Sequence, residues 1–165
     1  MKIFIAGDIS NWNIDNFSIK KISKKFINYI KEADICIFNL EGPIKTKKND
    51  GDIEYRSNKL VNFFLKTAVR LSGKKQPQVF SNQKIIDLLK INKNTIVTLA
   101  NNHIKDLGKR GFLETIKIIN KNKIKFLGAG ENIKEANKIL RIKKIAIINT
   151  CWVATKKGFF SFIFI

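Results

Sequence analysis

Apolar positions along the chain follow two spacings, and each spacing predicts a different kind of element. Short, nearly continuous apolar runs predict buried strands, and they lie at 2–7, 34–40, 95–100, 124–127 and 142–150. Apolar residues that recur every three or four positions predict helices, and these lie at 18–31, from Ser81 to about Lys90, at 111–121 and at 132–138. Ser18 and Ser81 are predicted to cap the first two of these helices at their N-termini. Alternating strands and helices predict an α/β fold with parallel strands and right-handed crossover helices.

Two stretches depart from this alternation. Residues 44–78 are lysine-rich, with an acidic patch (NDGDIE) and one apolar run at helical spacing (LVNFFLKTAVRL), so we interpret them as an irregular excursion containing one helix. Residues 151–165 form an apolar tail without a recognisable motif, and we interpret it as a truncated or frame-shifted end. Its last run, GFFSFIFI, is too short to span a membrane. The remainder, 1–150, is predicted to be one domain.

The formal net charge of +19 is the most unusual compositional property. Such a charge is typical of proteins that bind nucleic acids or membrane surfaces. However, 28 of the 32 basic residues are lysines, and isoleucine and asparagine are abundant as well. AT-rich codons encode these residues, so a biased genome explains the charge at least as well as a ligand does. Recognition of nucleic acid would favour arginine side chains placed among aromatic residues. We therefore predict no specific nucleic-acid partner, and a basic nucleic-acid-binding domain is the least favoured alternative.

Two cysteines, Cys36 and Cys151, both lie in apolar strand-like runs. They are predicted to be buried free thiols, which suits a reducing compartment. No Cys/His spacing indicates a zinc site. The N-terminus enters a strand at once, so we expect no signal peptide, no transmembrane span and a cytoplasmic location.

Polar residues that a core does not need end or follow three of the predicted strands: Asp8, Asn39, Glu41, Asn101, Asn102 and His103. Each alone has an ordinary explanation as a turn former or a satisfied loop residue. The carboxyl ends of parallel strands line one edge of a sheet, where ligands bind. Neighbouring strands would bring these side chains together at that edge. Carboxylates, amide oxygens and an imidazole suit Mn²⁺, Mg²⁺, Fe or Zn²⁺.

Three segments carry a resemblance to a known family: FIAGDI (4–9), ADICIFNLEGPI (33–44) and TLANNHIKDLGKRGFLETIKIINKNKIKFLGAGENIKEA (98–136). They resemble bacterial capsule-synthesis proteins of the CapA type, which have the calcineurin-like metallophosphoesterase fold. The resemblance covers about the first 150 residues apart from 44–78. It implies that this chain holds the first half of a metallophosphoesterase-like α/β sandwich. Within it, Gly128-Ala129-Gly130 lacks the remainder of a phosphate-binding fingerprint and is interpreted as a strand-to-helix turn.

The resemblance implies a metal site. Asp8 would be the first metal ligand, and Glu41, together with Asn39, would bring the second strand's oxygens to the metal. Asn102 would ligate through its amide oxygen. The cofactor would be a divalent cation, with Mn, Mg, Fe and Zn all open.

The resemblance also implies a proton donor. His103 would donate a proton to a leaving oxygen, or a hydrogen bond to a bound phosphate. Asp106 and Gly108 would shape the loop, and Asp106 would orient the imidazole. The substrate would be a phosphate-containing molecule or an anionic surface polymer, such as poly-γ-glutamate or a polysaccharide.

Two departures from the family pattern concern histidines. Ser10 stands where many metallophosphoesterases have a histidine, and no histidine follows His103, although the family supplies more from the second half of its fold. With only the present donors, we expect divalent metal binding to be weak or absent. We therefore interpret the chain as an N-terminal fragment with an uncovered edge strand and sheet surface. Whether it is an active metal-dependent phosphoesterase, or a non-catalytic fragment that needs a second polypeptide, stays open.

Overall fold

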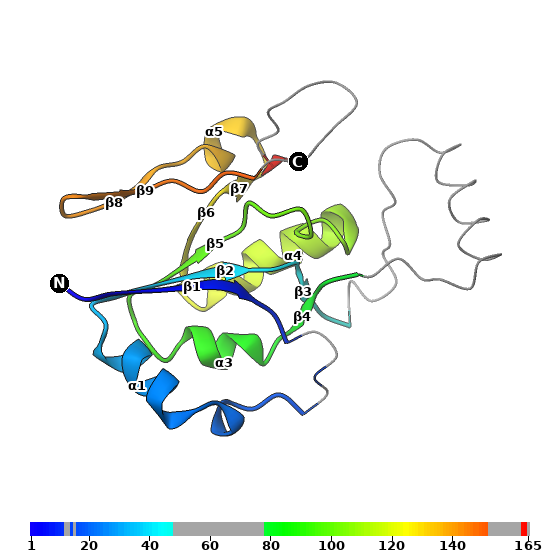
Figure 1. Ribbon diagram of the computed structural model, residues 1–165. Helices are drawn as coiled ribbons and strands as arrows, with labels where there is room; N and C mark the ends of the chain where they lie inside the picture. The colour runs from blue at the N-terminus through cyan, green and yellow to red at the C-terminus, as the bar shows by residue number, and fades with distance from the viewer. Residues whose placement is uncertain (12–13, 15, 48–77, 152–162, 165) are drawn as a thin grey trace, which may run out of the picture.

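A four-stranded parallel sheet forms the centre of the computed structural model, which describes residues 1–11, 14, 16–47, 78–151 and 163–164 (Figure 1). In spatial order its strands are β1 (Ile3–Ile9), β2 (Ile35–Leu40), β5 (Thr95–Thr98) and β6 (Lys125–Leu127). The strands join the sheet in chain order, so right-handed crossovers place all the connecting helices on one face. The predicted α/β fold with a parallel sheet is confirmed.

The main hydrophobic core lies between the sheet and the helices α1 (Lys24–Glu32), α3 (Ile85–Leu89) and α4 (Gly108–Lys121). β2 shows how the strands contribute to it, because its alternate side chains, Cys36, Phe38 and Leu40, are all fully buried in this cluster. The helices supply the other side of the cluster with residues such as Ile30, Leu89, Phe112 and Ile119. The apolar faces of the strands and of the helices therefore pack against each other in one layer.

The predicted helix at 18–31 is divided in two. A 3₁₀ turn, η1 (Ile19–Lys21), comes first, and Ser18 caps it by accepting a hydrogen bond from the Lys20 N–H at 3.3 Å. The chain is extended at Ile22 before α1 begins, and the side chain of its N-cap Ser23 makes no cap bond. The predicted cap was therefore right for the short turn but not for the α-helix.

Two short strands join the segments that flank residues 48–77. β3 (Ile44–Lys45) pairs in parallel with β4 (Ser81–Asn82). The prediction that Ser81 caps a helix is wrong, because Ser81 is fully buried in β4 and α3 begins only at Ile85. The pairing of Ser81 with Ile44 links residues far apart in sequence, and helical periodicity cannot reveal such a contact.

The opposite face of the sheet is covered in part by an antiparallel hairpin of β8 (Leu140–Ile142) and β9 (Ile145–Ile147) (Figure 1). The predicted single strand at 142–150 is therefore wrong. Lys143 adopts φ +53° and turns the chain back on itself. The hairpin forms a second, smaller core with the central sheet, and its members are Ile35, Ile96 and Leu127 with Ile37, Leu140, Ile142 and Ile147 packed around them.

The hairpin leaves β1 uncovered on this face. Within the part of the chain that the structure describes, β1 is an edge strand, and its Ile3 and Ile5 side chains are 40% and 71% exposed. The expectation of an exposed edge and apolar sheet surface therefore holds for the described residues. Solvent-facing isoleucines on an edge strand are a recognised route to association between chains.

The remaining elements follow β6. β7 (Ala129–Gly130) leads into α5 (Ile133–Ala136), and β10 (Ile163–Phe164) pairs with β7 in parallel. The predicted helix inside 44–78 and most of the predicted tail 151–165 lie outside the described residues. No helix in the described ranges is long and apolar enough to cross a membrane.

Both cysteines are free thiols. Cys36 is buried as predicted, whereas Cys151 is only half-buried. Burial raises the pKa of the Cys36 thiol to about 11 and also raises the pKa of Cys151. Both therefore stay protonated at neutral pH, which fits structural rather than nucleophilic thiols.

Candidate functional site

A row of three polar side chains crosses the carboxyl ends of the central strands. Asp8 of β1 pairs in register with Asn39 of β2, and Asn39 pairs with Thr98 of β5. The Asn39 amide Nδ2 donates to Asp8 Oδ1, and the Thr98 hydroxyl lies 3.2 Å from Asn39 Oδ1. The row therefore directs the Asn39 amide hydrogens towards the carboxylate and its oxygen towards Thr98.

A bulge in β1 determines which way Asp8 faces. Ile5 pairs with Ile37 and Asp8 with Asn39, so β1 uses three residues where β2 uses two. Side chains in a regular strand alternate between faces, so Ile5 and Asp8 would otherwise point in opposite directions. The extra residue brings Asp8 to the same face as Asn39 instead of towards the main core.

Glu41 follows β2 directly and lies near the histidine. Its backbone N–H donates to Ile9 O at 3.0 Å, and its side chain is 28% exposed. Gly42 then turns the chain at φ +77°, where an added Cβ would lie 2.1 Å from the Val79 carbonyl oxygen. This turn requires glycine. It leaves Glu41 Oε1 3.9 Å from His103 Nε2.

Asn101 anchors the loop that carries His103. Its side chain is buried, donates to Leu40 O at 2.8 Å, and accepts from the N–H groups of Gly42 at 3.3 Å and His103 at 3.2 Å. One amide therefore satisfies backbone groups of both the β2 turn and the histidine loop. Asn101 is a structural residue that holds the two candidate segments together.

The imidazole of His103 is held by Asp106. Nδ1 lies 2.7 Å from Asp106 Oδ2, and the same carboxylate oxygen accepts from the Val79 N–H at 2.9 Å. A carboxylate at Nδ1 favours a proton on that nitrogen, which leaves Nε2 as the atom that exchanges protons with a ligand. Asp106 is therefore placed where it can orient the imidazole, and the role that the resemblance implies for it stays a prediction.

Gly108 ends the loop and begins α4. It has φ +65°, which favours glycine, and its N–H donates to Lys105 O at 2.8 Å. The loop closes through a further bond from the Asp106 N–H to His103 O at 2.9 Å. Asp106 and Gly108 thus both donate backbone bonds that close this turn.

Asn102 is exposed and lies between the buried Asn101 and the half-buried His103. The two adjacent asparagines therefore have different environments, and only Asn102 presents its amide to solvent. The structure thus brings Asp8 to Asn39, and His103 to both Asp106 and Glu41. The roles of Asp8, Asn39, Glu41 and Asn102 in metal binding, and of His103 as a proton donor, stay predictions.

Ser10 and Asn11 connect the end of β1 to β4, a link that the sequence did not reveal. Ser10 Oγ donates to Phe80 O at 3.2 Å. The side chain of Asn11 is buried and exchanges hydrogen bonds with Asn82, its Nδ2 donating to Asn82 Oδ1 at 2.7 Å and its Oδ1 accepting from the Asn82 N–H at 2.7 Å. Ser10, which stands where many metallophosphoesterases have a histidine, therefore takes part in a hydrogen-bond network that links the end of β1 to the β4 segment.

The donor types at this edge suit a divalent cation, but their arrangement is incomplete. Among the described residues, no three His, Cys, Asp or Glu side chains form a group that could hold a metal ion. Asp8 and Glu41 offer the carboxylate oxygens that Mg²⁺ and Mn²⁺ prefer. The Nδ1 of His103 is engaged by Asp106. A divalent cation at this edge would therefore need further oxygen donors, such as the exposed amide of Asn102, to complete a coordination shell.

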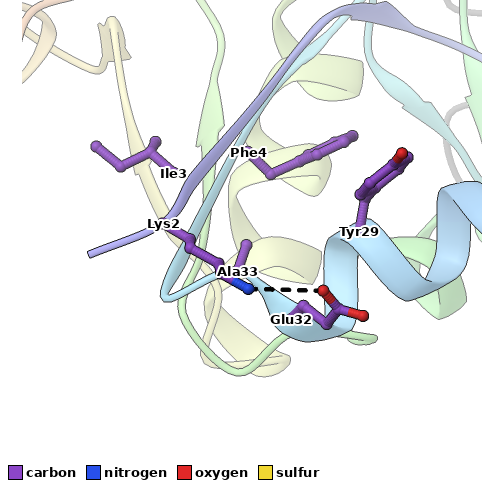
Figure 2. A pocket seen from close by; sticks show the side chains of 6 residues that line it. All are labelled: Lys2, Ile3, Phe4, Tyr29, Glu32 and Ala33. Atoms are coloured by element: carbon purple, nitrogen blue, oxygen red, sulfur yellow. Dashed lines mark ion pairs between the residues drawn. The ribbon is translucent and has the colours of Figure 1, made fainter.

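A separate shallow cavity of about 260 Å³ lies near the start of β1 and the end of α1 (Figure 2). Its lining residues are Lys2, Ile3, Phe4, Tyr29, Glu32 and Ala33. The pair of Lys2 Nζ and Glu32 Oε2, 3.7 Å apart, is exposed and contributes little stability. None of the candidate residues lines this cavity, which is formed at the amino end of β1, whereas the candidate residues lie at its carboxyl end.

Comparison with known proteins decides the family. A family model described as bacterial capsule synthesis protein PGA_cap matches residues 2–159. The chain belongs to this family. Proteins of the PGA_cap family have a metallophosphoesterase-like fold, and the match includes every candidate residue from Asp8 to Gly108. The predicted family resemblance is confirmed.

A curated relative supports the same assignment. The chain is 29% identical over 114 residues to the capsule biosynthesis protein CapA of Bacillus anthracis. The match covers 68% of this chain but 23% of the relative, so the chain spans less than a quarter of that protein. Membership of a capsule-synthesis family is therefore established for this PGA_cap chain, and the activity of the whole relative is not transferred with it.

Proposed function

We propose that this PGA_cap chain acts in the synthesis of an anionic surface polymer through a cation-assisted site that cleaves or transfers a phosphate ester. The observation that carries this proposal is the pairing of His103 with Asp106 at 2.7 Å, at the strand ends that also carry Asp8 and Glu41. A histidine held through Nδ1 by a carboxylate is suited to move a proton at Nε2.

Proton donation by His103 balances the hydrolytic step. A water oxygen bonds to phosphorus as the ester P–O bond breaks, and the leaving oxygen takes the proton from the protonated His103 Nε2. The attacking water releases one proton to solvent, and a solvent proton restores the imidazole. Asp106 retains its bond to Nδ1 throughout and stabilises the imidazolium. In a transfer reaction, an acceptor hydroxyl takes the place of water.

Asp8 and Glu41 would provide carboxylate oxygens to a divalent cation, joined by the amide of Asn102. The bound cation would offset the negative charge of the phosphoryl group. Thr98 orders the Asn39 amide, which in turn directs its hydrogens to Asp8 Oδ1. Asp8 Oδ2 would then be the oxygen that binds the cation.

The test is Mn²⁺-dependent hydrolysis of phenyl phosphate, whose poor leaving group needs a proton. We expect the wild-type chain to hydrolyse it, and His103→Ala to lower kcat roughly 100-fold, the contribution typical of general acid catalysis. Asn137→Ala is the matched control, because Asn137 is exposed at the end of α5. Equal rates for wild type and His103→Ala would remove His103 from the mechanism.

A second candidate function is a non-catalytic role in a complex with another polypeptide. The exposed Ile3 and Ile5 on the edge strand β1 favour it, because solvent-facing isoleucines there are suited to cover by a second chain. This alternative predicts no Mn²⁺-dependent turnover and a species larger than the monomer in size-exclusion chromatography. A monomer that turns over phenyl phosphate would contradict it.

A further inference from the structure

The side chain of Asn149 fills a gap at the end of β5. The last backbone bond between β5 and the β6 segment runs from the Leu99 N–H to Leu127 O at 3.0 Å. The next N–H, that of Ala100, donates to Asn149 Oδ1 at 2.7 Å. Ala100 is buried, so its N–H needs a protein acceptor once the strand partner has ended. Asn149, just after β9, provides it.

Gly128 makes room for this contact. It turns the chain after β6 with φ +89°, and an added Cβ would lie 2.0 Å from Asn149 Oδ1 and 3.0 Å from the Ala100 Cβ. Three segments of the chain therefore meet at one amide: the turn after β6, the end of the hairpin and the loop after β5. Such close approach requires glycine at the turn.

The loop that carries His103 is held at its start from two sides. Asn101 ties it to the β2 segment through Leu40 O and the Gly42 N–H. Asn149 ties the preceding residue, Ala100, to the hairpin. The chain then needs only two further residues to reach His103, whose N–H is itself bonded to Asn101 Oδ1. A displacement of Ala100 would therefore move the start of the segment that carries the histidine.

We propose that Asn149 is a positioning residue for His103, acting through the Ala100 N–H to fix the loop on which the imidazole is presented. The inference rests on the proposed function for its effect on turnover, but its effect on the imidazole is independent of that function. Reaction rates respond steeply to placement, and a misplacement of about 1 Å can cost on the order of 100-fold.

The test compares three substitutions of Asn149. Asn149→Leu keeps the branched shape and the number of heavy atoms of the side chain but has no acceptor, Asn149→Ala removes the branch and the acceptor, and Asn149→Asp retains the Oδ1 acceptor. Asn137→Ala is again the control. Because His103 is the only histidine, uniform ¹⁵N labelling gives imidazole signals that belong to it alone. Amide hydrogen exchange at Ala100 reports the bond itself.

We expect Asn149→Leu to speed exchange of the Ala100 amide about tenfold, since its protecting bond is lost, and to shift the imidazole ¹⁵N signals. It should lower kcat for phenyl phosphate about tenfold with little change in KM. In Asn149→Asp, the exchange rate of the Ala100 amide, the imidazole ¹⁵N signals and kcat should all return towards the wild-type values. If Asn149→Ala does not fold, Asn149→Leu and Asn149→Asp still decide the question.

Unchanged imidazole signals in a folded Asn149→Leu variant would overturn the proposal, even if the chain loses stability. Equal losses in Asn149→Leu and Asn149→Asp would also overturn it, because the acceptor would then be irrelevant. If the wild-type chain shows no turnover, the proposed function fails, while the exchange and ¹⁵N measurements still test the positioning role of Asn149.

Discussion

Asp106 Oδ2 lies 2.7 Å from His103 Nδ1 and also accepts the Val79 N–H at 2.9 Å. The carboxylate is therefore fixed by the backbone of a segment 27 residues away in the sequence, and it holds the imidazole from a fixed point. A histidine oriented in this way keeps its Nε2 directed outwards, where Glu41 Oε1 lies 3.9 Å away.

Replacing Asp106 with asparagine should disturb the imidazole more than the fold. The neutral amide can still accept the Val79 N–H, but it no longer favours a proton on His103 Nδ1. We expect the ¹⁵N signals of the single histidine to change towards a mixture of tautomers, and turnover to fall by at least about tenfold. Asp87→Asn, an exposed carboxylate on α3, is the control. Unchanged tautomer signals would show that Asp106 does not orient the ring.

Alanine substitutions of the adjacent residues Asn101 and Asn102 should change the free energy of unfolding by very different amounts. Asn101→Ala leaves Leu40 O and the Gly42 N–H without partners in a buried region, so the free energy of unfolding should fall by about 2–3 kcal/mol. Asn102→Ala should change it by less than about 0.5 kcal/mol, because the side chain is exposed.

Urea denaturation measures both stabilities, and Mn²⁺ titration by calorimetry measures the predicted ligand role of Asn102. Under the proposed function, Asn102→Ala weakens Mn²⁺ binding while the fold remains intact. A large loss of stability in Asn102→Ala, or none in Asn101→Ala, would contradict the division between an anchoring and a ligating asparagine.

Much of the fold could be predicted because local patterns carried it. The apolar runs of β1, β2 and β5 and the intervening helical periodicity lead directly to neighbouring parallel strands. The hairpin could not be found in this way, because a turn at Lys143 with φ +53° has no glycine, asparagine or proline to indicate it. The place of Ser81 in β4 depends on its distant partner Ile44.

The candidate site also contains residues that local sequence reveals and residues that only distant contacts reveal. His103, Asp106 and Gly108 lie within six residues of one another, so a local motif reveals them. Thr98 and Asn149 were missed, since a threonine ending a strand is an ordinary strand former and an asparagine after a strand is an ordinary turn residue. Their contacts, with Asn39 and with Ala100, join residues 59 and 49 positions apart.

A side chain at position 42 should destabilise the fold, whereas a side chain at position 7 should be tolerated. At Gly42 an added Cβ would lie 2.1 Å from the Val79 carbonyl oxygen, and φ is +77°. Gly42→Ala should therefore lower the free energy of unfolding by about 3 kcal/mol, through both the clash and the strained backbone. At Gly7 nothing lies within 4 Å of an added Cβ, so Gly7→Ala should change it by less than about 0.5 kcal/mol. Thermal unfolding of the two variants checks the contrast, and similar losses would contradict it.

Cys36 should make the stability of the protein depend on alkaline pH. Burial raises the pKa of its thiol from 9.0 to about 11 in the folded state, and its Sγ donates to Ile30 O at 3.4 Å. Below about pH 9 the thiol is protonated whether the chain is folded or unfolded, so its contribution is fully present. Between about pH 9 and pH 11 the unfolded chain ionises first, and the contribution is lost as pH rises, by about 2–3 kcal/mol in total.

The other groups that titrate in this range, mainly lysines, affect wild type and Cys36→Ala alike, so the difference between the two isolates Cys36. Urea denaturation from pH 8 to pH 10.5 should show that the stability advantage of wild type over Cys36→Ala narrows as pH rises. Cys151→Ala provides the matched comparison, because Cys151 is only half-buried and its ionisation costs the folded state less. Parallel pH curves for wild type and Cys36→Ala would mean that the thiol ionises as easily in the folded chain as in the unfolded one.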